Sequence, residues 1–336
     1  SGTTAISNDN PVATKKDTAK AAIDSALREK EAAIDANNDL TTEEKNAAKA
    51  DAQAKATAAK TAIDNATTNA AVDSAQTAGT TSVSSVMPTA VAKPAAKKAI
   101  EDALKAKVAQ LDARNDLTTE EKEAAKADAQ ARATAAKNNI DTATTNSTVD
   151  NAKTTGVADV ESVNPQASQK KTDAKNAVDE ALKAKEAEID ANNDLTAEEK
   201  SKAKEDAKSK ADVAKQAIDN ATTNDAVTQA KNAGAISVDS VTPTPVAKPA
   251  AKQAIDDALK AKNDAIDANN DLTDEEKAKA KEDAKAKADA AKQAIDNATT
   301  NDAVEQAKND GATSISSVTP TPTAKPAAKQ AIDDAL

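Results

Sequence analysis

Apolar side chains recur along this chain at the spacing of helices, and the whole pattern returns after 77 or 78 residues. Between residues 284 and 298 five of the apolar positions lie at steps of four, three, four and three. They are Ala284, Ala288, Ala291, Ile295 and Ala298. Such steps place all five on one face of a helix. The longer period indicates a tandem array of one supersecondary unit.

Three kinds of residue keep this period, with spacings of 77, 78 and 77 residues in each set. They are the leucines of NDLT (Leu40, Leu117, Leu195, Leu272), the last asparagines of ATTN (Asn69, Asn146, Asn224, Asn301) and the glycines Gly79, Gly156, Gly234 and Gly311. We predict repeats at 12–88, 89–165, 166–243 and 244–320. Residues 1–11 are expected to be the tail of a preceding repeat and residues 321–336 the start of a following one, as in a piece of a longer array.

Each repeat is predicted to form three helices, and the fourth repeat shows the pattern. Its first helix is expected to start near Pro249, because proline is favoured at the first helical position, and to run to about Ala268. The polar letters NNDLT then break the helix. The second helix is expected to begin at Thr273, with Glu276 completing a capping box. The same pair occurs at Thr41–Glu44, Thr118–Glu121 and Thr196–Glu199.

Charged residues four apart on the second helix, Glu275–Lys279 and Asp283–Lys287, are expected to pair on its exposed face. The letters NATTN are expected to end this helix and to cap the third one. The third helix contains the repeat's glycine. Apolar residues stand seven before, four after and seven after it, as with Val304, Ile315 and Val318 around Gly311.

This register predicts that the third helix continues through the glycine and places it on the buried face. There it would cost about 1 kcal/mol in helix propensity but would let a neighbouring backbone approach closely. The alternative is that the helix ends at the glycine and an irregular tail follows. We predict the continuous helix, because the apolar register survives the glycine in all four repeats.

Leu, Ile and Val make up only about an eighth of the chain, below the ~20% at which disorder must be considered. A disordered chain, however, has no reason to keep helix caps and apolar stripes in register over four repeats. The predicted fold is therefore all-α: a tandem array of four three-helix bundles with thin, alanine-rich cores. Four bundles end to end would form an elongated rod of roughly 150–200 Å, at 1.5 Å per helical residue.

Prolines cluster where one repeat meets the next, in VMPTAVAKP (86–94), VTPTPVAKP (241–249) and VTPTPTAKP (318–326). They forbid one continuous helix between repeats and favour a short extended segment. The second joint, VNPQASQKK (163–171), differs. It is interpreted as having Lys171 where the other joints have a proline: Pro94, Pro249 and Pro326.

Composition excludes most chemistry. The 336 residues include no Phe, Tyr, Trp, Cys or His, so there is no thiol nucleophile, imidazole base or soft metal ligand. No apolar run approaches the ~20 residues of a membrane helix. The net charge of −11 comes from 45 basic and 56 acidic residues that are interleaved. Such a surface, without stacking aromatic rings, predicts neither nucleic acid binding nor membrane insertion.

No residue is predicted to be catalytic, cofactor-binding or metal-binding, and the chain is not expected to be an enzyme. The acid pair Glu275 and Glu276 is explained by its place at the start of a helix. The letters DLTDEE (271–276) lack the glycine and ligand order of a calcium loop. An internal isopeptide bond needs a buried lysine beside a buried asparagine and a carboxylic acid, and no position is expected to be both buried and polar.

Residues 247–318 carry the order of motifs on which a family resemblance rests: an AK.AID opening, an EEK helix start, AIDNATTN, and a glycine before a short apolar end. All four repeats resemble the domain-of-unknown-function repeats of giant Gram-positive cell-wall-anchored surface proteins of the extracellular-matrix-binding or biofilm-associated type. The resemblance implies spectrin-like three-helix units, in a surface rod below an adhesive head and above an anchor. It implies an extracellular, cell-wall-anchored location and no ligand residues.

Two functions follow as hypotheses. The first is a structural stalk or spacer of a bacterial cell-surface adhesin that projects a binding head from the cell wall. The alternative is a weak multivalent binding module for host extracellular-matrix proteins, or for self-association in a biofilm. Binding hot spots favour Trp, Tyr and Arg, and the chain has only Arg28, Arg114 and Arg132 of these. Otherwise the expected partners of each repeat are its neighbours in the chain.

Overall fold

The structure is a computed structural model that describes residues 11–336. The predicted tail of a preceding repeat, residues 1–11, lies outside the described residues except for its last residue. The chain divides into two compact units, Ser1–Ala167 and Ser168–Leu336. Helices make up most of the described residues of both units, and no strand occurs within residues 11–336.

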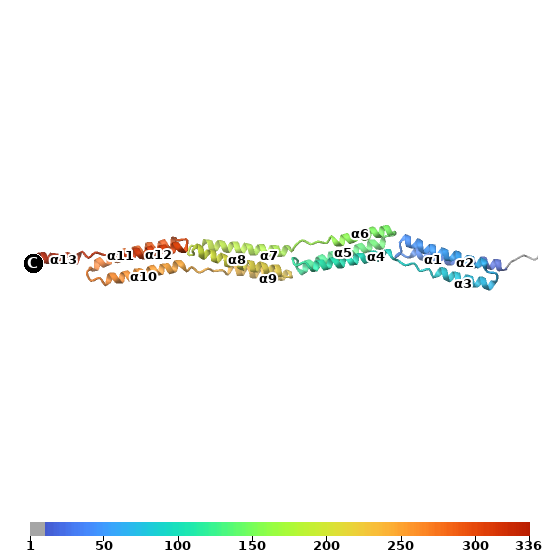
Figure 1. Cartoon of the computed structure of the whole chain (residues 1–336), viewed down its shortest axis with the longest axis horizontal. Helices are drawn as coiled ribbons and strands as arrows, with labels where there is room; N and C mark the ends of the chain where they lie inside the picture. Colours follow the sequence, from blue (N-terminus) through green and yellow to red (C-terminus); the bar gives the residue numbers. More distant parts are fainter. Residues whose placement is uncertain (1–10) are drawn as a thin grey trace, which may run out of the picture. The chain divides into compact units, whose positions relative to one another are not determined.

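Six helices form the described part of the first unit (Figure 1): α1 (Pro11–Ala36), α2 (Thr42–Asn65), α3 (Asn69–Ser84), α4 (Ala92–Asp112), α5 (Thr119–Thr142) and α6 (Asn146–Glu161). Seven form the second unit: α7 (Gln169–Ala191), α8 (Ala197–Asn220), α9 (Asn224–Asp239), α10 (Ala247–Asp267), α11 (Asp274–Asn297), α12 (Asn301–Ser316) and α13 (Ala324–Ala335). Each successive trio from α1 to α12 packs as a three-helix bundle. The prediction of four three-helix bundles is confirmed.

The second helix of each repeat buries the predicted alanine stripe. In the fourth repeat, Ala288, Ala291 and Ile295 of α11 pack against Ile255 of α10 and Ile315 of α12. A second cluster, with Ile266, Leu272, Ala280, Ala284 and Val318, fills the other end of the same bundle. Half-buried Leu259 contacts both clusters. Alanine knobs let the three helices approach closely, which is how so few large side chains fill a core.

The third helix of each repeat runs through its glycine, as predicted. Gly79, Gly156, Gly234 and Gly311 lie buried inside α3, α6, α9 and α12. A methyl group added at Gly79 would lie 2.5 Å from the Cβ of Ala59 and 2.7 Å from Cδ1 of Ile23. Glycine is therefore needed at this point by the close approach of α3 to α2 and α1, and no left-handed backbone is involved.

Ion pairs connect the first and second helices of each bundle at three levels. In the first repeat they are Lys20–Asp64 and Lys49–Asp35, both at 2.8 Å, and Lys60–Asp24. The fourth repeat has the equivalent pairs Lys252–Asp296, Lys281–Asp267 and Lys292–Asp256. The expected pairs along α11, Glu275–Lys279 and Asp283–Lys287, do not form. Lys287 instead donates to the hydroxyl oxygen of Ser314 on α12, at 3.4 Å. Exposed ion pairs each contribute about 0–1 kcal/mol.

The first helix of the fourth repeat begins two residues earlier than predicted. Helix α10 starts at Ala247, and Pro249 occupies its third position. Proline costs no hydrogen bond there, because the first N–H groups of a helix have no partner within the helix. No side chain of its own caps α10, whose N-cap residue is Val246.

The close packing at Gly311 leads to a stability prediction. Gly311→Ala should lower the melting temperature, although alanine is the better helix former by about 1 kcal/mol. The added methyl group meets the Cβ of Ala291 and lies 2.9 Å from Cδ1 of Ile255. Overpacking of this kind costs about 1–3 kcal/mol. Thermal unfolding followed by circular dichroism measures the effect.

Two further variants make this test specific. Ala291→Gly added to Gly311→Ala should restore part of the lost stability, because it removes the opposing methyl group. Asp310→Ala, at an exposed neighbouring position, should leave the melting temperature equal or higher. A melting temperature that rises in Gly311→Ala would show that α12 does not approach α11 as closely as described.

Candidate functional site

The polar groups that are both buried and recurrent lie where one bundle meets the next. Two such joints fall inside the units: the first joint, between the α1–α3 and α4–α6 bundles, and the third joint, between the α7–α9 and α10–α12 bundles. Each contains a glutamate that begins a second helix, a lysine that begins the following first helix, and the Thr-Thr-Asn turn before the following third helix. The contacts at the two joints are the same.

The glutamate of the capping box caps two helices at once. At the third joint, Oε2 of Glu199 accepts a hydrogen bond from the N–H of Thr196 at 3.0 Å, which closes the predicted capping box of α8. Its Oε1 accepts from the N–H groups of Val246 at 2.9 Å and Ala247 at 3.0 Å, at the start of α10. Glu199 therefore supplies the cap that α10 lacks.

Glu44 does the same at the first joint. It accepts from the N–H of Thr41 within its own repeat, and from the N–H groups of Val91 and Ala92 at the start of α4, all at 2.9 Å. The N-cap residue of α4, Val91, also makes no side-chain cap of its own. Unpaired N–H groups at a helix start are costly when they are shielded from water, so this carboxylate stabilises the first turn of the next repeat.

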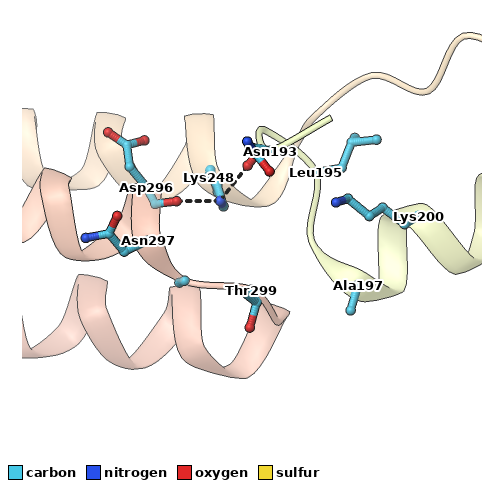
Figure 2. A pocket seen from close by; sticks show the side chains of 9 residues that line it. Asn193, Leu195, Ala197, Lys200, Lys248, Asp296, Asn297 and Thr299 are labelled. Carbon is cyan, nitrogen blue, oxygen red and sulfur yellow. Dashed lines mark hydrogen bonds between the residues drawn. The ribbon is translucent and has the colours of Figure 1, made fainter. Parts of the chain in front are cut away.

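A buried lysine makes the return contact. Nζ of Lys248 donates to the carbonyl oxygen of Asn193 at 2.8 Å, in the loop between α7 and α8, and to that of Asp296 at 2.7 Å, at the end of α11 (Figure 2). Lys248 is 5% exposed. Lys93 makes the equivalent bonds to Asn38 and Asp141 at the first joint. A buried ammonium group is tolerated only when it is hydrogen-bonded, and here backbone carbonyls of two repeats provide the acceptors.

Threonine and asparagine complete the joint. The hydroxyl of Thr196 donates to Oδ1 of Asn301 at 2.7 Å, and the N–H of Ala197 donates to the carbonyl of Thr299 at 2.7 Å. The N–H of Asn301, at the start of α12, donates to Oε2 of Glu198 at 3.0 Å. At the first joint Thr41, Thr42 and Glu43 contact the turn at Thr144–Asn146 in the same way.

A polar cleft of about 390 Å³ lies beside these contacts at the third joint. Figure 2 shows Asp296 on the fourth-repeat side and Lys200 across from it on α8 of the third repeat, with Lys248 between them. An equivalent cleft of about 400 Å³ at the first joint includes Lys45 and Lys93. Both Lys200 and Lys45 donate to carbonyl oxygens of their own repeat. Several groups that line the cleft take part in the joint contacts, among them Asn193, Lys248 and Asp296.

The interpretation that Lys171 stands where the other joints have a proline is wrong. Lys171 does not replace a proline: it is 5% exposed, and its Nζ donates to the carbonyl of Asp219 at 2.8 Å, as Lys248 does to that of Asp296. Thr172 is the residue that stands in the proline position. The start of α7 differs from that of α10, because the side chain of Ser168 caps α7 by accepting from the N–H of Lys171 at 3.2 Å.

The joint glutamates have lowered pKa values. Burial raises the pKa of Glu199, but the N–H donors of Ala247, Thr196 and Val246 outweigh it, and the pKa lies below its ordinary value. The same opposing causes lower the pKa of Glu44. For Glu276, the N–H groups of Thr273, Thr323 and Ala324 lower the pKa to about 2. These carboxylates are therefore charged acceptors, not proton donors.

Of the acid pair of the fourth repeat, Glu276 is explained by its contacts. Glu276 closes the capping box of α11 and also accepts from the first residues of α13, so it has a structural partner on each side. Within residues 11–336 no group of three or more acidic side chains is placed to hold a metal ion. The expectation that no position is both buried and polar was wrong: Lys93, Lys171 and Lys248 are such positions. Their ammonium groups meet backbone carbonyls, which cannot form an isopeptide bond.

The joint lysines follow the repeat period of the sequence, so the period could have pointed to them. Lys16, Lys93, Lys171, Lys248 and Lys325 are spaced by 77, 78, 77 and 77 residues. The signal is weak because the half-buried Lys20, Lys97, Lys175 and Lys252 keep the same spacing. Sequence alone therefore cannot say which lysine of a helix enters the joint.

The four repeats define a tandem all-helical repeat protein whose polar joints are built from the repeat's own motifs. The chain belongs to the family described as Domain of Unknown Function (DUF1542), which matches residues 15–91, 92–168, 170–246 and 247–323. The family resemblance expected from the sequence is confirmed.

Similar proteins include two from Staphylococcus aureus. The extracellular matrix-binding protein EbhA of strain Newman is 32% identical over 228 residues, covering 68% of this chain and 7% of that protein. The extracellular matrix-binding protein ebh of strain NCTC 8325 / PS 47 has the same identity, over 68% of this chain and 2% of that protein. The chain thus spans a small fraction of the curated relatives it matches.

A crystal structure of the 756–1003 domain of EbhA from Staphylococcus aureus is also similar, with 18% identity and a TM-score of 0.22. The alignment covers 86% of this chain and 99% of that one. Separately, none of the helices described here combines the length and apolar character required to cross a membrane.

The joint carboxylates predict a dependence of stability on pH. Their pKa values are lowered on folding, from 4.5 to about 2 for Glu276, so their stabilising effect is complete above about pH 4.5 and is lost as the pH falls toward 2. The variant Glu44→Gln/Glu199→Gln/Glu276→Gln lacks these titrations. Its deficit in melting temperature relative to the unsubstituted chain should shrink between about pH 6 and pH 2.

Circular dichroism melts over this range measure the deficit. Glu205→Gln is the control, because Glu205 is exposed on α8 and takes no part in the joint contacts described above. Its effect should stay nearly constant with pH. A deficit of the triple variant that is the same at pH 6 and pH 2 would contradict the described role of the carboxylates.

Proposed function

We propose that this chain is a structural spacer segment of a bacterial cell-surface adhesin, and that it holds a binding head away from the cell wall. The observation that carries the proposal is the joint: Glu199 and Lys248 at the third joint and Glu44 and Lys93 at the first make the same buried contacts between neighbouring repeats. A segment that connects its repeats by residues of the repeat itself can be extended by adding copies.

Other features of the described residues support a spacer rather than an enzyme. The recurrent buried polar groups form hydrogen bonds at the joints, and ion pairs connect helices of one bundle. The family description assigns no reaction. The relatives that the chain matches are named as matrix-binding surface proteins, which supports a place on the outside of a bacterial cell. Attachment to the cell wall is part of the proposal. So are the predicted repeat boundaries at 12–88, 89–165, 166–243 and 244–320.

A second candidate is favoured by one observation, the name of those relatives. As an extracellular matrix-binding protein, EbhA provides a reason to propose that repeats of this chain bind a host matrix protein weakly and gain avidity by repetition. This chain has three arginines, and two of them form ion pairs within the chain: Arg114 with Asp116 and Arg132 with Asp128. Their engagement favours the spacer over a binding surface, since arginine is a preferred hot-spot residue.

Small-angle scattering tests the spacer directly. A row of four bundles about 150–200 Å long has a radius of gyration of about 50 Å, whereas a compact chain of this length would have about 20 Å. The spacer proposal predicts the larger value at physiological salt. A value near 20 Å would contradict it, because folded-back repeats cannot hold a head away from a surface.

Binding measurements separate the two candidates. The chain is immobilised and exposed to fibronectin and to free copies of itself at physiological salt. The spacer proposal predicts no binding tighter than about 100 μM, which corresponds to less than about 6 kcal/mol of binding free energy. Micromolar or tighter binding to either would favour the binding module. An unrelated helical protein of similar acidic charge is the control for non-specific adsorption.

A further inference from the structure

Neighbouring repeats exchange essential contacts in both directions. Glu199 of the third repeat accepts the first N–H groups of α10 in the fourth, at Val246 and Ala247. Lys248 of the fourth repeat donates to the carbonyl of Asn193, in the loop between α7 and α8 of the third. These are called the reciprocal contacts. Glu44 and Lys93 make the equivalent reciprocal contacts at the first joint.

Each repeat loses hydrogen bonds at the joint when its neighbour unfolds. Without the third repeat, α10 has only its N-cap residue Val246, whose side chain cannot cap it. The N–H groups of its first turn would then lack their acceptor, and a missing cap typically costs about 1 kcal/mol. Lys248 would retain the Asp296 carbonyl of its own repeat but lose Asn193.

Because the core of each bundle is thin, the loss of these hydrogen bonds has a large effect on its stability. The largest side chains of the fourth-repeat cluster are isoleucines, and much of the cluster is alanine. A bundle with so little large apolar area to bury has little stability in excess, so a contact from the neighbour changes the folded fraction strongly. In a linear array, stability is a sum of repeat terms and interface terms, and the interface terms decide whether repeats unfold singly or together.

We propose that the reciprocal contacts are a coupling device, which transmits the loosening of one repeat to the next. The third and fourth repeats share one cooperative opening through Glu199 and Lys248. The first and second repeats share another through Glu44 and Lys93. The inference goes beyond the spacer function, since a spacer could equally be a row of independent bundles.

The test loosens the third repeat far from the joint and observes the fourth. Ile218 is fully buried near the end of α8 that is remote from Glu199, which begins that helix. Ile218→Val should destabilise the third repeat and accelerate its slowest amide exchange by roughly 2- to 10-fold. If the repeats are coupled, the amides of α11 and α12 accelerate by a comparable factor. Hydrogen exchange of the full chain, resolved by mass spectrometry of peptides, measures both repeats in one sample.

A background without both partners shows whether the reciprocal contacts carry the effect. In a Glu199→Ala/Lys248→Met background, the third and fourth repeats should be uncoupled, and adding Ile218→Val should leave α11 and α12 unchanged relative to that background alone. The matched control is Lys252→Met. Lys252 lies one turn farther along α10 and pairs with Asp296 inside its own repeat, so transmission should persist in that background.

Three results decide the proposal. Acceleration of α11 and α12 in Ile218→Val that disappears in the Glu199→Ala/Lys248→Met background and survives in the Lys252→Met background supports it. Exchange of the fourth repeat that is unchanged in Ile218→Val while the third repeat accelerates would overturn it. Transmission that survives in the Glu199→Ala/Lys248→Met background would also overturn it, because the coupling would then run through other contacts. None of these results depends on whether the chain acts as a spacer.

Discussion

Close approach of helix backbones is the constraint on which the rest of this structure depends. Alanine and glycine at the contact positions let three helices pack with few large side chains, as where Gly311 faces Ala291. A core built this way is thin, and lysines on one helix readily reach carboxylates on the next. It also leaves each bundle with little stability in excess, so the groups at its ends become important.

The ends of the bundles are completed by their neighbours. The first helix of a repeat follows a proline-rich segment and has an N-cap residue such as Val246, whose side chain cannot cap it. The preceding repeat supplies a carboxylate for that purpose. In return the helix buries an ammonium group among the carbonyls of both repeats. Because these contacts use residues that every repeat carries, they suit a chain that grows by adding copies, which agrees with the family to which it belongs.

Much of the fold could be predicted from the sequence, since helix caps and apolar steps are local signals. Thr273 and Glu276 predicted the start of α11, and the register around Gly311 predicted a continuous α12. The joint could not be predicted, because its contacts link residues about 50 to 100 positions apart and use both oxygens of a glutamate that already has a local role. The interpretation of Lys171 as the counterpart of a proline is wrong for a related reason: the buried lysine recurs in this repeat, and the proline that follows it at the other joints does not.

The burial of the joint lysines is the most direct measure of this account. Mild acylation of the native chain with an amine-reactive ester, read out by peptide mass spectrometry, compares lysines of identical intrinsic chemistry. Lys93, Lys171 and Lys248 should react much more slowly than Lys97, Lys175 and Lys252 on the same helices, while the exposed Lys325 should react fast. Equal rates at Lys248 and Lys252 would show that the ammonium group is not held between two repeats, and would contradict the account.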